Sequence, residues 1–449
     1  ELPSLCLLEI FIRNKMTLNV EVISEETIKP SSPTPNHLKT FQLSLVDQYA
    51  PPVHVPVLLF YSANEHNKVE NTAHTNRLKE SLSEVLTQFY PLAGRITGHE
   101  AIDCSDEGVS FSEARISGEL KQVLNNPIPQ ELDQLLPRID EFYGLGPKVL
   151  LSIQVNIFSC GGMILAVCTS HKLLDGSSMS VFLNNWASLS RGDSKLLHPK
   201  FNMTSLFPPK DIPSPMPPIG SPHKVVSKRF IFDASNIAAL RAITKDAIEN
   251  PTRVEVVSAL IWRCAMNAVR MRTKSLRSSA SVVNFAVNLR GRMDPPLSND
   301  FVGNLMIGKS VESSTDIQQK FHSLVSQLRK GLRSIDSGYV KKLQSDNGLS
   351  ELYDSTIRFF EMDVKGELEA YVITSWCRFP FYEADFGWGK PSWLTSVNLV
   401  AKNIIMLMDT NCGNGIEAWV SLIEEDMASF ECEPDIITFT SAKSGLELN

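Results

Sequence analysis

The stretch that decides the fold is Met-Ile-Leu-Ala-Val-Cys-Thr-Ser-His-Lys-Leu-Leu-Asp-Gly-Ser-Ser, residues 163–178. It opens with the nearly continuous apolar run Met163–Val167, which suits a strand buried on both faces of a sheet. A helix is predicted from about Ser178 to Ser190, because apolar side chains recur there at helical spacing, and Gly192 is well placed to end it. The polar turn between strand and helix should therefore lie at the edge of a sheet, where clefts form.

His171 and Asp175 occupy this turn. A histidine in a cleft can act as a general base near neutral pH, and Asp175 is near enough in sequence to shape the turn. The pattern H-x-x-x-D is short and arises often by accident, and histidines at strand ends commonly make only local hydrogen bonds. The residues alone therefore leave a catalytic and a purely structural histidine both open.

Strands and helices are predicted on both sides of this stretch. The predicted strands are Thr40–Val46, Val53–Tyr61, Val149–Phe158, Val225–Phe232, Ala280–Leu289, Tyr371–Cys377, Asn398–Leu407 and Gly415–Leu422. The predicted helices are 72–90, Asn236–Ile248, 252–272, Ile317–Ser334 and Glu424–Phe430. Thr252 and Glu255 match a capping box at the start of the third of these helices.

Residues 206–223 hold seven prolines and give the strongest linker signal in the chain. We therefore predict two α/β domains of similar size, 16–205 and 224–449, on either side of this linker. Residues 1–15 precede the first methionine, Met16, and we expect this leader to lie outside the fold. Its apolar run is short and lacks a basic flank, so it makes a poor signal peptide.

Composition excludes several classes of function. The net charge of −7 argues against nucleic acid as a partner, because phosphate binding needs a concentrated positive field. No run approaches the roughly 18 apolar residues of a membrane-spanning helix, so the cytoplasm is the expected location. The eight cysteines form no C-x-x-C pair and the histidines no H-x-x-x-H pair, so we expect no metal site and a reducing compartment.

One basic cluster stands out against this acidic background. It consists of Arg263, Arg270, Arg272, Lys274 and Arg277. The cluster is either a solvated helix end or a contact to the phosphates of an anionic cofactor, and the sequence leaves both open.

Two motifs carry a family resemblance. Residues 170–176 contain H-x-x-x-D-G, and about 210 residues later Asp385-Phe386-Gly387-Trp388-Gly389 reads D-F-G-W-G. From about residue 20 to residue 445 the chain resembles the plant BAHD acyltransferases, whose two main motifs these are. Lesser markers agree, namely Phe89–Arg95, Asn288-Leu289-Arg290 and Gly303-Asn304.

The resemblance implies an α/β fold of two chloramphenicol-acetyltransferase-like domains with a channel at their interface. It also implies a monomer that binds no cofactor and uses acetyl-CoA or another acyl-CoA as co-substrate. His171 would lie in the channel and take the proton of the acceptor hydroxyl, whose oxygen then attacks the thioester carbonyl. No covalent acyl-enzyme is needed, and the sequence indeed lacks a G-x-S-x-G elbow.

The resemblance also suggests roles for further residues. Thr374 and Trp376 are the candidate donors to the oxyanion, although both are also ordinary residues for a strand. Asp175 should form a salt bridge with Arg290 that fixes the turn, rather than relay protons. Asp385, Gly387, Trp388 and Gly389 should form a tight structural loop that shapes the channel or the coenzyme A site.

The acceptor is predicted from a finer resemblance. Residues 25–35, 288–293 and 374–378 are most similar to the vinorine synthase-like alkaloid O-acetyltransferase branch. This implies acetyl transfer to a hydroxyl of a plant alkaloid, most simply of the monoterpene indole type. Leu173-Leu174 departs from the Ile-Ala typical of that branch, which leaves a volatile-ester or amine acyltransferase open. A non-catalytic binding homologue and a lone serine hydrolase are the alternatives from other classes.

Overall fold

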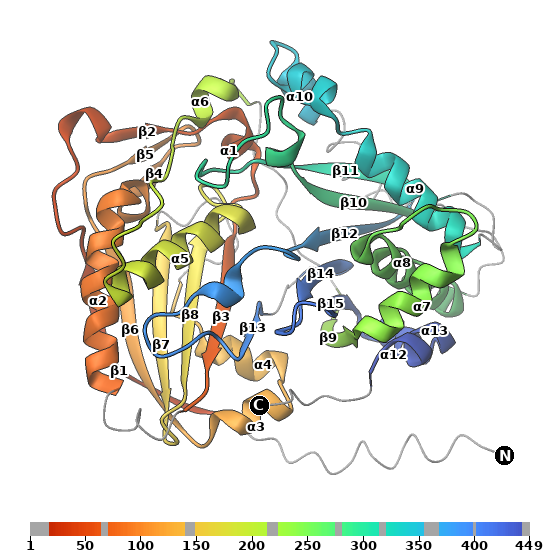
Figure 1. Ribbon diagram of the computed structural model, residues 1–449, viewed down its shortest axis with the longest axis horizontal. Helices are drawn as coiled ribbons and strands as arrows, with labels where there is room; N and C mark the ends of the chain where they lie inside the picture. Colours follow the sequence, from red (N-terminus) through yellow and green to blue (C-terminus); the bar gives the residue numbers. More distant parts are fainter. Residues whose placement is uncertain are drawn as a thin grey trace.

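Two six-stranded sheets organise the chain, one in each half of the molecule (Figure 1). The computed structural model describes residues 18–63, 71–139, 149–212, 223–273, 281–313, 320–353, 368–397 and 401–441. The predicted leader lies outside these residues. So do residues 213–222 of the predicted linker, whose remaining part begins at the end of α6 (Met203–Leu206).

The first sheet has the strand order β1-β6-β7-β8-β3-β13. Its strands are β1 (Asn19–Ile28), β6 (Val109–Ser117), β7 (Leu151–Phe158), β8 (Met163–Ser170), β3 (His54–Tyr61) and β13 (Trp393–Thr395). All pairs are antiparallel except β6 with β7. Every residue of β8 is buried, as the apolar run Met163–Val167 predicts.

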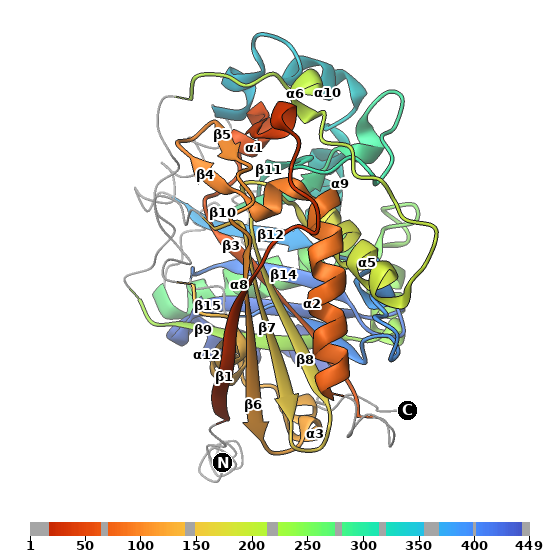
Figure 2. The ribbon, with the colours of Figure 1, turned by 90° about the vertical axis from the view of Figure 1, so that its left-hand side faces the viewer.

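Two long helices cover one face of this sheet, α2 (Asn71–Gln88) and α5 (Gly176–Arg191) (Figure 2). The predicted apolar stripe of α2 is fully buried, from Leu78 through Val85 to the following Phe89. α5 begins at the N-cap Asp175 and ends at Gly192, whose φ of 76° is the left-handed conformation expected of a glycine C-cap.

The second sheet has the order β11-β10-β12-β14-β15-β9. Its strands are β11 (Met306–Glu312), β10 (Ser281–Asn288), β12 (Glu369–Ser375), β14 (Ile404–Asp409), β15 (Ile416–Ile423) and β9 (Val225–Phe232). Only β10–β12 and β12–β14 are parallel pairs. The long helix α8 (Arg253–Thr273) packs on this sheet through a second core, and its predicted capping box is present between Thr252 and Glu255.

The remaining elements are short. The further α-helices are α1 (Leu45–Tyr49), α3 (Leu120–Asn125), α4 (Pro129–Leu132), α7 (Ala234–Thr244), α9 (Phe321–Arg333), α10 (Ser337–Leu343), α12 (Glu424–Glu431) and α13 (Pro434–Phe439). A small third sheet pairs β2 (Thr40–Gln42), β5 (Ala101–Asp103) and β4 (Arg95–Thr97). The 3₁₀ turns are η1 (Asn36–Leu38), η3 (Tyr90–Ala93), η4 (Asp133–Leu135), η5 (Arg290–Arg292) and η6 (Phe381–Glu383).

One predicted strand, Thr40–Val46, is wrong in its second half. Only β2 is extended there, and α1 begins at Leu45. Ser44 and Asp47 form a capping box, in which each side chain accepts a hydrogen bond from the other residue's backbone N–H. These two bonds favour a helix start over continued strand, although the residues themselves are apolar enough for either.

The two halves of the chain are interleaved. β13 belongs to the C-terminal half by sequence, yet it pairs with β3 at the edge of the first sheet. In the other direction, Met406 and Trp419 of the second sheet pack into the core of the first. The interface between the sheets is therefore built from both halves.

Candidate active site

The turn after β8 holds His171 at the edge of the first sheet. The backbone N–H of His171 donates to the carbonyl of Val53 at 2.8 Å, which extends the pairing of β8 with β3. The following Leu173 and Leu174 are buried in the core of the first domain, and this packing fixes the turn on the sheet. His171 itself is only partly buried.

Asp175 closes the turn and caps α5. Its Oδ1 accepts the backbone N–H of Ser178 at 2.8 Å, and its Oδ2 accepts that of Leu305 at 3.0 Å. Arg290 Nη1 lies 2.7 Å from Oδ2 and Nη2 lies 3.2 Å from Oδ1, so the ion pair expected from the resemblance is present and bidentate.

Both partners of this ion pair are buried. Burial alone would raise the pKa of Asp175, but the Arg290 guanidinium and the hydrogen bonds from Ser178 outweigh it and hold the pKa below its usual range. Loss of one partner would leave the other charge buried and unpaired, at a cost of about 3–5 kcal/mol. The pair joins the turn on the first domain to η5 on the second, and so fixes the turn across the interface.

Asn304 contacts the imidazole of His171 and was noted in the sequence only as part of a family marker. Its Oδ1 lies 2.9 Å from His171 Nδ1. Its Nδ2 donates to the His171 carbonyl at 2.7 Å and to Asp47 Oδ1 at 3.2 Å, which determines the orientation of the amide. Because an amide oxygen can only accept, the hydrogen of the neutral imidazole lies on Nδ1 and the lone pair on Nε2.

Burial lowers the pKa of His171, and this effect outweighs the opposing influences of the nearby Asp175 carboxylate and the Asn304 hydrogen bond. The imidazole is therefore neutral at pH 7 and able to take up a proton on Nε2. A neutral histidine with a fixed tautomer has the chemistry of a general base.

Thr374 and Trp376 lie at the interface between the domains. Thr374 pairs with Met406, and cross-strand partners share a face of the sheet; this face packs against the first domain. Trp376 follows β12 and its indole approaches the turn of His171 at Gly176. A Cβ on Gly176 would lie 3.1 Å from Trp376 Nε1 and 3.0 Å from the ring of Phe379, so any larger residue there would have to displace these rings by a few tenths of an ångström.

The D-F-G-W-G loop is bound to the far end of α5 from His171. Asp385 Oδ1 accepts the N–H groups of Gly387 and Gly389 at 2.8 and 2.9 Å, which closes the loop on itself. Ser190 Oγ donates to the Phe386 carbonyl at 2.8 Å, and Arg191 donates to that of Asp385. Since these contacts are made at the last turn of a 16-residue helix whose first turn follows His171, the loop lies away from the imidazole.

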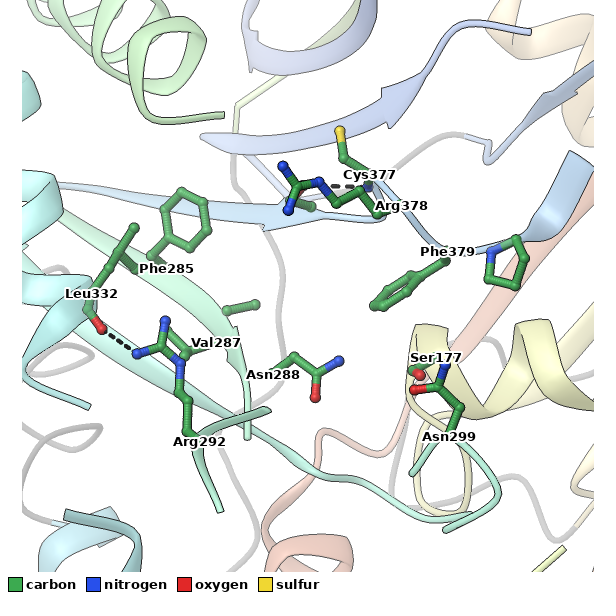
Figure 3. Close-up of a pocket in the computed structure, with 13 residues that line it drawn as sticks. Ser177, Phe285, Val287, Asn288, Arg292, Asn299, Leu332, Cys377, Arg378 and Phe379 are labelled. Carbon is green, nitrogen blue, oxygen red and sulfur yellow. Dashed lines mark hydrogen bonds between the residues drawn. The ribbon is translucent and has the colours of Figure 1, made fainter. Parts of the chain in front are cut away.

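A cavity of about 360 Å³ opens beside the turn (Figure 3). It lies between β10, the end of β12 and the first turn of α5, which contributes Ser177. Two arginines line it, Arg292 from η5 and Arg378 after β12. Arg292 Nη1 donates to the carbonyl of Leu332 at 2.7 Å, which holds the guanidinium at the wall. Neither arginine was predicted from the sequence to contact a ligand.

The basic cluster singled out in the sequence is engaged elsewhere. Arg263 pairs with Asp435 at 2.5 Å and Arg272 with Asp426 at 2.6 Å, both on the far side of the second domain. Arg270 donates to Asn267, and Lys274 and Arg277 lie outside the described residues. The described members of the cluster therefore make structural contacts.

Two further features of the described residues bear on the kind of site. Within them, no group of three or more His, Cys, Asp or Glu side chains is arranged to hold a metal ion. None of the helices described has both the length and the apolar content required to cross a bilayer.

A model of the Transferase family matches residues 18–436. The chain belongs to this family. Vinorine synthase of Rauvolfia serpentina is 38% identical over 93% of this chain and 97% of its own. Its crystal structure superposes with a TM-score of 0.83, at 35% identity over 95% of this chain and 100% of that one.

Two other members of the Transferase family are similarly close. Stemmadenine O-acetyltransferase of Catharanthus roseus is 36% identical over 92% of this chain and 96% of its own. Limonoid 1-O-acetyltransferase of Citrus sinensis is 36% identical over 96% of this chain and 100% of its own. The predicted BAHD membership, the α/β fold with two sheet-rich domains, and the predicted enzyme class of acyltransferase are confirmed by these matches.

Proposed function

We propose that the chain transfers an acetyl group from acetyl-CoA to a hydroxyl group of a plant alkaloid, with His171 as the general base. The observation that carries the proposal is the contact of His171 Nδ1 with the amide oxygen of Asn304, 2.9 Å away. It leaves a lone pair on Nε2 of a neutral imidazole, in the turn that leads into α5, and Ser177 in the first turn of that helix lines a cavity of substrate size.

The reaction balances without a covalent intermediate. His171 Nε2 takes the proton of the acceptor hydroxyl while the hydroxyl oxygen attacks the thioester carbonyl. The tetrahedral oxyanion that forms collapses by breaking its carbon–sulfur bond. The coenzyme A thiolate leaves and receives the proton from Nε2, which returns the imidazole to its resting tautomer. Asp175 stays ionised throughout, because Arg290 holds its pKa low.

The other parts of the site have matching roles. Trp376, next to the turn at Gly176, and Thr374 on the same sheet face are our candidates for stabilising the oxyanion. The cavity with Arg292 and Arg378 would take the phosphate-bearing end of coenzyme A, since guanidinium groups suit phosphate oxygens. The D-F-G-W-G loop would serve as structural support, because its contacts are made at the far end of α5.

The acceptor is proposed from the relatives. Stemmadenine O-acetyltransferase and vinorine synthase support an alkaloid, as the resemblance in the sequence does. The limonoid 1-O-acetyltransferase is as similar and favours a second candidate, a hydroxyl of a limonoid. We also propose a cytoplasmic monomer, because the resemblance implies a monomer and the seven described cysteines are all free thiols, as in a reducing compartment.

The test is acetyl transfer measured by mass spectrometry. Purified protein is incubated with acetyl-CoA and a panel of stemmadenine, a limonoid alcohol, hexanol, benzyl alcohol and a simple amine. His171→Ala is run beside His99→Ala, which removes an exposed histidine as a matched control. We expect acetylated stemmadenine from the wild type and from H99A, and a loss of kcat of at least about 100-fold in H171A.

Each other outcome has a definite meaning. Acetylation of the limonoid alone would exclude an alkaloid acceptor in favour of a limonoid. Acetylation of hexanol or the amine alone would exclude both the alkaloid and the limonoid. Full activity of folded H171A would refute the base. Absence of transfer from a folded wild type across several acyl-CoA donors would favour a non-catalytic binding protein. Inhibition by a serine-reactive reagent would favour a hydrolase.

A further inference from the structure

Asp47 is a buried carboxylate that neither the family motifs nor the mechanism above uses. It lies on α1, far from His171 in sequence, and is 1% exposed. Its Oδ2 accepts hydrogen bonds from the N–H and the hydroxyl of Ser44, at 3.1 and 2.5 Å. Its Oδ1 accepts from the backbone N–H and the side-chain amide of Asn304, at 2.8 and 3.2 Å.

The two oxygens of this carboxylate do different things. Oδ2 completes the capping box of α1, which is a local role that any helix start can have. Oδ1 makes no contact within α1 and instead binds both N–H groups of Asn304, a residue of the other domain. Capping alone therefore does not account for the position of Asp47.

The contact determines which way the Asn304 amide faces. Its Nδ2 group has two hydrogens, and the two acceptors within reach are the His171 carbonyl and Asp47 Oδ1. In the opposite orientation the amide oxygen would face these two acceptors, and its NH₂ group would face His171 Nδ1. Without Asp47 the NH₂ group of Asn304 would keep only one of its two acceptors, the His171 carbonyl. The preference for the observed orientation of the amide would then be weaker.

We propose that Asp47 is a positioning residue for acetyl transfer, acting through Asn304 to keep the hydrogen of the His171 imidazole on Nδ1 and the lone pair on Nε2. This inference rests on the proposed function of His171 as the base. No proton moves to Asn304 or Asp47 during the reaction, because an amide oxygen is too weak a base to take one. Asp47 touches no reacting atom, and its effect lies in the tautomer.

The positioning effect of Asp47 also depends on its own ionisation, which the surrounding groups influence. Burial raises the pKa of Asp47 to about 6, against the opposing effect of its hydrogen bonds from Ser44 and Asn304. Lys172 is a cation whose charge interacts with that of Asp47. Burial lowers the pKa of Lys172 to about 8, and Asp47 opposes this effect. Its Nζ donates to the Gln48 carbonyl at 2.6 Å. Asp175 and Arg290, on the other side of Asn304, are paired with each other.

A protonated Asp47 carries a hydrogen where the ionised carboxylate only accepts. That hydrogen must face either Ser44 or Asn304, and it then replaces an accepted hydrogen bond. The positioning effect should therefore weaken as the pH falls through about 6, where this carboxylate gains its proton.

The test compares Asp47→Ala and Asp47→Asn with Glu255→Gln. Glu255 is the matched control, because it is also the third-position carboxylate of a capping box, that of α8, and pairs with Arg329 away from the site. The full-length proteins are labelled with ¹⁵N in histidine, and the His171 signals are assigned by their absence in His171→Gln. At pH 8 the ring nitrogen shifts report which nitrogen carries the hydrogen.

We expect wild type and E255Q to show a single tautomer with the hydrogen on Nδ1, and D47A to show a mixture. With acetyl-CoA and stemmadenine, kcat of D47A should fall on the order of 10- to 100-fold, with KM within about threefold. D47N keeps an acceptor oxygen, so its tautomer population and its kcat should both lie between those of D47A and wild type. This variant also serves where D47A folds poorly.

Two results would overturn the proposal. One is a tautomer in folded D47A that is as purely Nδ1–H as in the wild type or, where D47A does not fold, the same result in D47N. The other is a loss of kcat that only follows the loss of folded protein, as in a purely structural role. The tautomer is read in the resting protein without turnover. A wild type that transfers no acetyl group would therefore count against the proposed function and leave the tautomer result to decide on Asp47.

Discussion

Two buried aspartates on either side of Asn304 differ in what balances their charge. Asp175 is paired with Arg290 and its pKa lies below the usual range. Asp47 is held by uncharged donors from Ser44 and Asn304, and burial raises its pKa to about 6. The first is therefore ionised at neutral pH, whereas the second changes its charge at a pH of about 6.

This difference predicts opposite dependences of stability on pH. The folded pKa of Asp47 lies above the value of 3.8 expected in the unfolded chain. Its contribution to stability is thus present below pH 3.8 and is lost as the pH rises through 6. The loss integrates to about 3 kcal/mol. Asp47→Asn removes this titration, so its thermal midpoint relative to wild type should rise between pH 4 and 6.5 and then level off.

Asp175→Asn is a control for which the pH dependence of stability should have the opposite sign. The depressed pKa of Asp175 means that its stabilisation is present above the unfolded pKa and is lost as the pH falls through the folded value. The midpoint of D175N relative to wild type should therefore improve toward acid pH. A constant difference between D47N and wild type across the range would show that Asp47 is ionised or neutral throughout.

At the residue scale, the sequence predicted the members of the site that stand in a motif. Asp175 and Arg290 form the ion pair that the resemblance implied, and His171 lies in the same turn as Asp175. Asn304 and Asp47 were not predicted to act together with them, because they lie 133 and 124 positions from His171 along the chain. Asn304, in the loop before β11, contacts the imidazole, and Asp47 on α1 contacts Asn304. No spacing rule connects such residues, since only the packing of the two domains brings them into contact.

At the scale of elements, prediction succeeded where periodicity was strong. β8 and β9 match the apolar runs that predicted them, and the α2 stripe is buried as expected. β1 was missed because it is an edge strand with mostly exposed residues, so it lacks an apolar alternation. α1 was mistaken for strand, since five residues are too few for helical periodicity and only the capping box marked it.

The D-F-G-W-G loop allows a matched pair of substitutions. Gly387 and Gly389 have φ of 110° and 108°, which side chains rarely adopt. A Cβ on Gly387 would lie 2.9 Å from Arg77 Nη1, whereas nothing lies within 4 Å of one on Gly389. Arg77 Nε donates to the carbonyl of Ser190, so a shift of its guanidinium would strain this contact between α2 and α5.

We therefore expect Gly389→Ala to cost roughly 1–3 kcal/mol through backbone strain alone. Gly387→Ala should cost up to about 1 kcal/mol more, the value of one hydrogen bond, because the guanidinium of Arg77 must shift. Thermal unfolding measures both, and kcat per folded molecule should stay within about twofold of wild type. A well-folded G387A without activity would instead give this loop a direct part in the chemistry.

At the scale of the whole molecule, the sequence indicated two domains but not their interleaving. β13 is only three residues long, and nothing in Trp393–Thr395 shows that it pairs with β3, more than 300 positions earlier. Trp393 Nε1 donates to Glu417 at 3.1 Å, and Glu417 pairs with Arg229 on β9. The first sheet is thus held to the second by a buried indole, which donates to one partner of an ion pair within the second sheet.

This interleaving predicts that residues 1–212 cannot fold alone. Phe381, Phe386 and Trp393 are each at most 1% exposed in the core of the first domain, and all three come from the C-terminal half. Each large aromatic side chain removed from a core costs about 3–5 kcal/mol. Loss of three would exceed about 9 kcal/mol, which is comparable with the whole stability of an ordinary domain.

The measurement compares two ways of separating the halves. Residues 1–212 expressed alone should be insoluble or show no cooperative melting. The full chain, cut after folding at a protease site inserted within 213–222, should stay assembled on gel filtration and keep its acetyl transfer, because the contacts across the interface survive the cut. A soluble 1–212 fragment with a cooperative transition would mean that the aromatic residues of the C-terminal half only cover a core that the N-terminal half completes by itself.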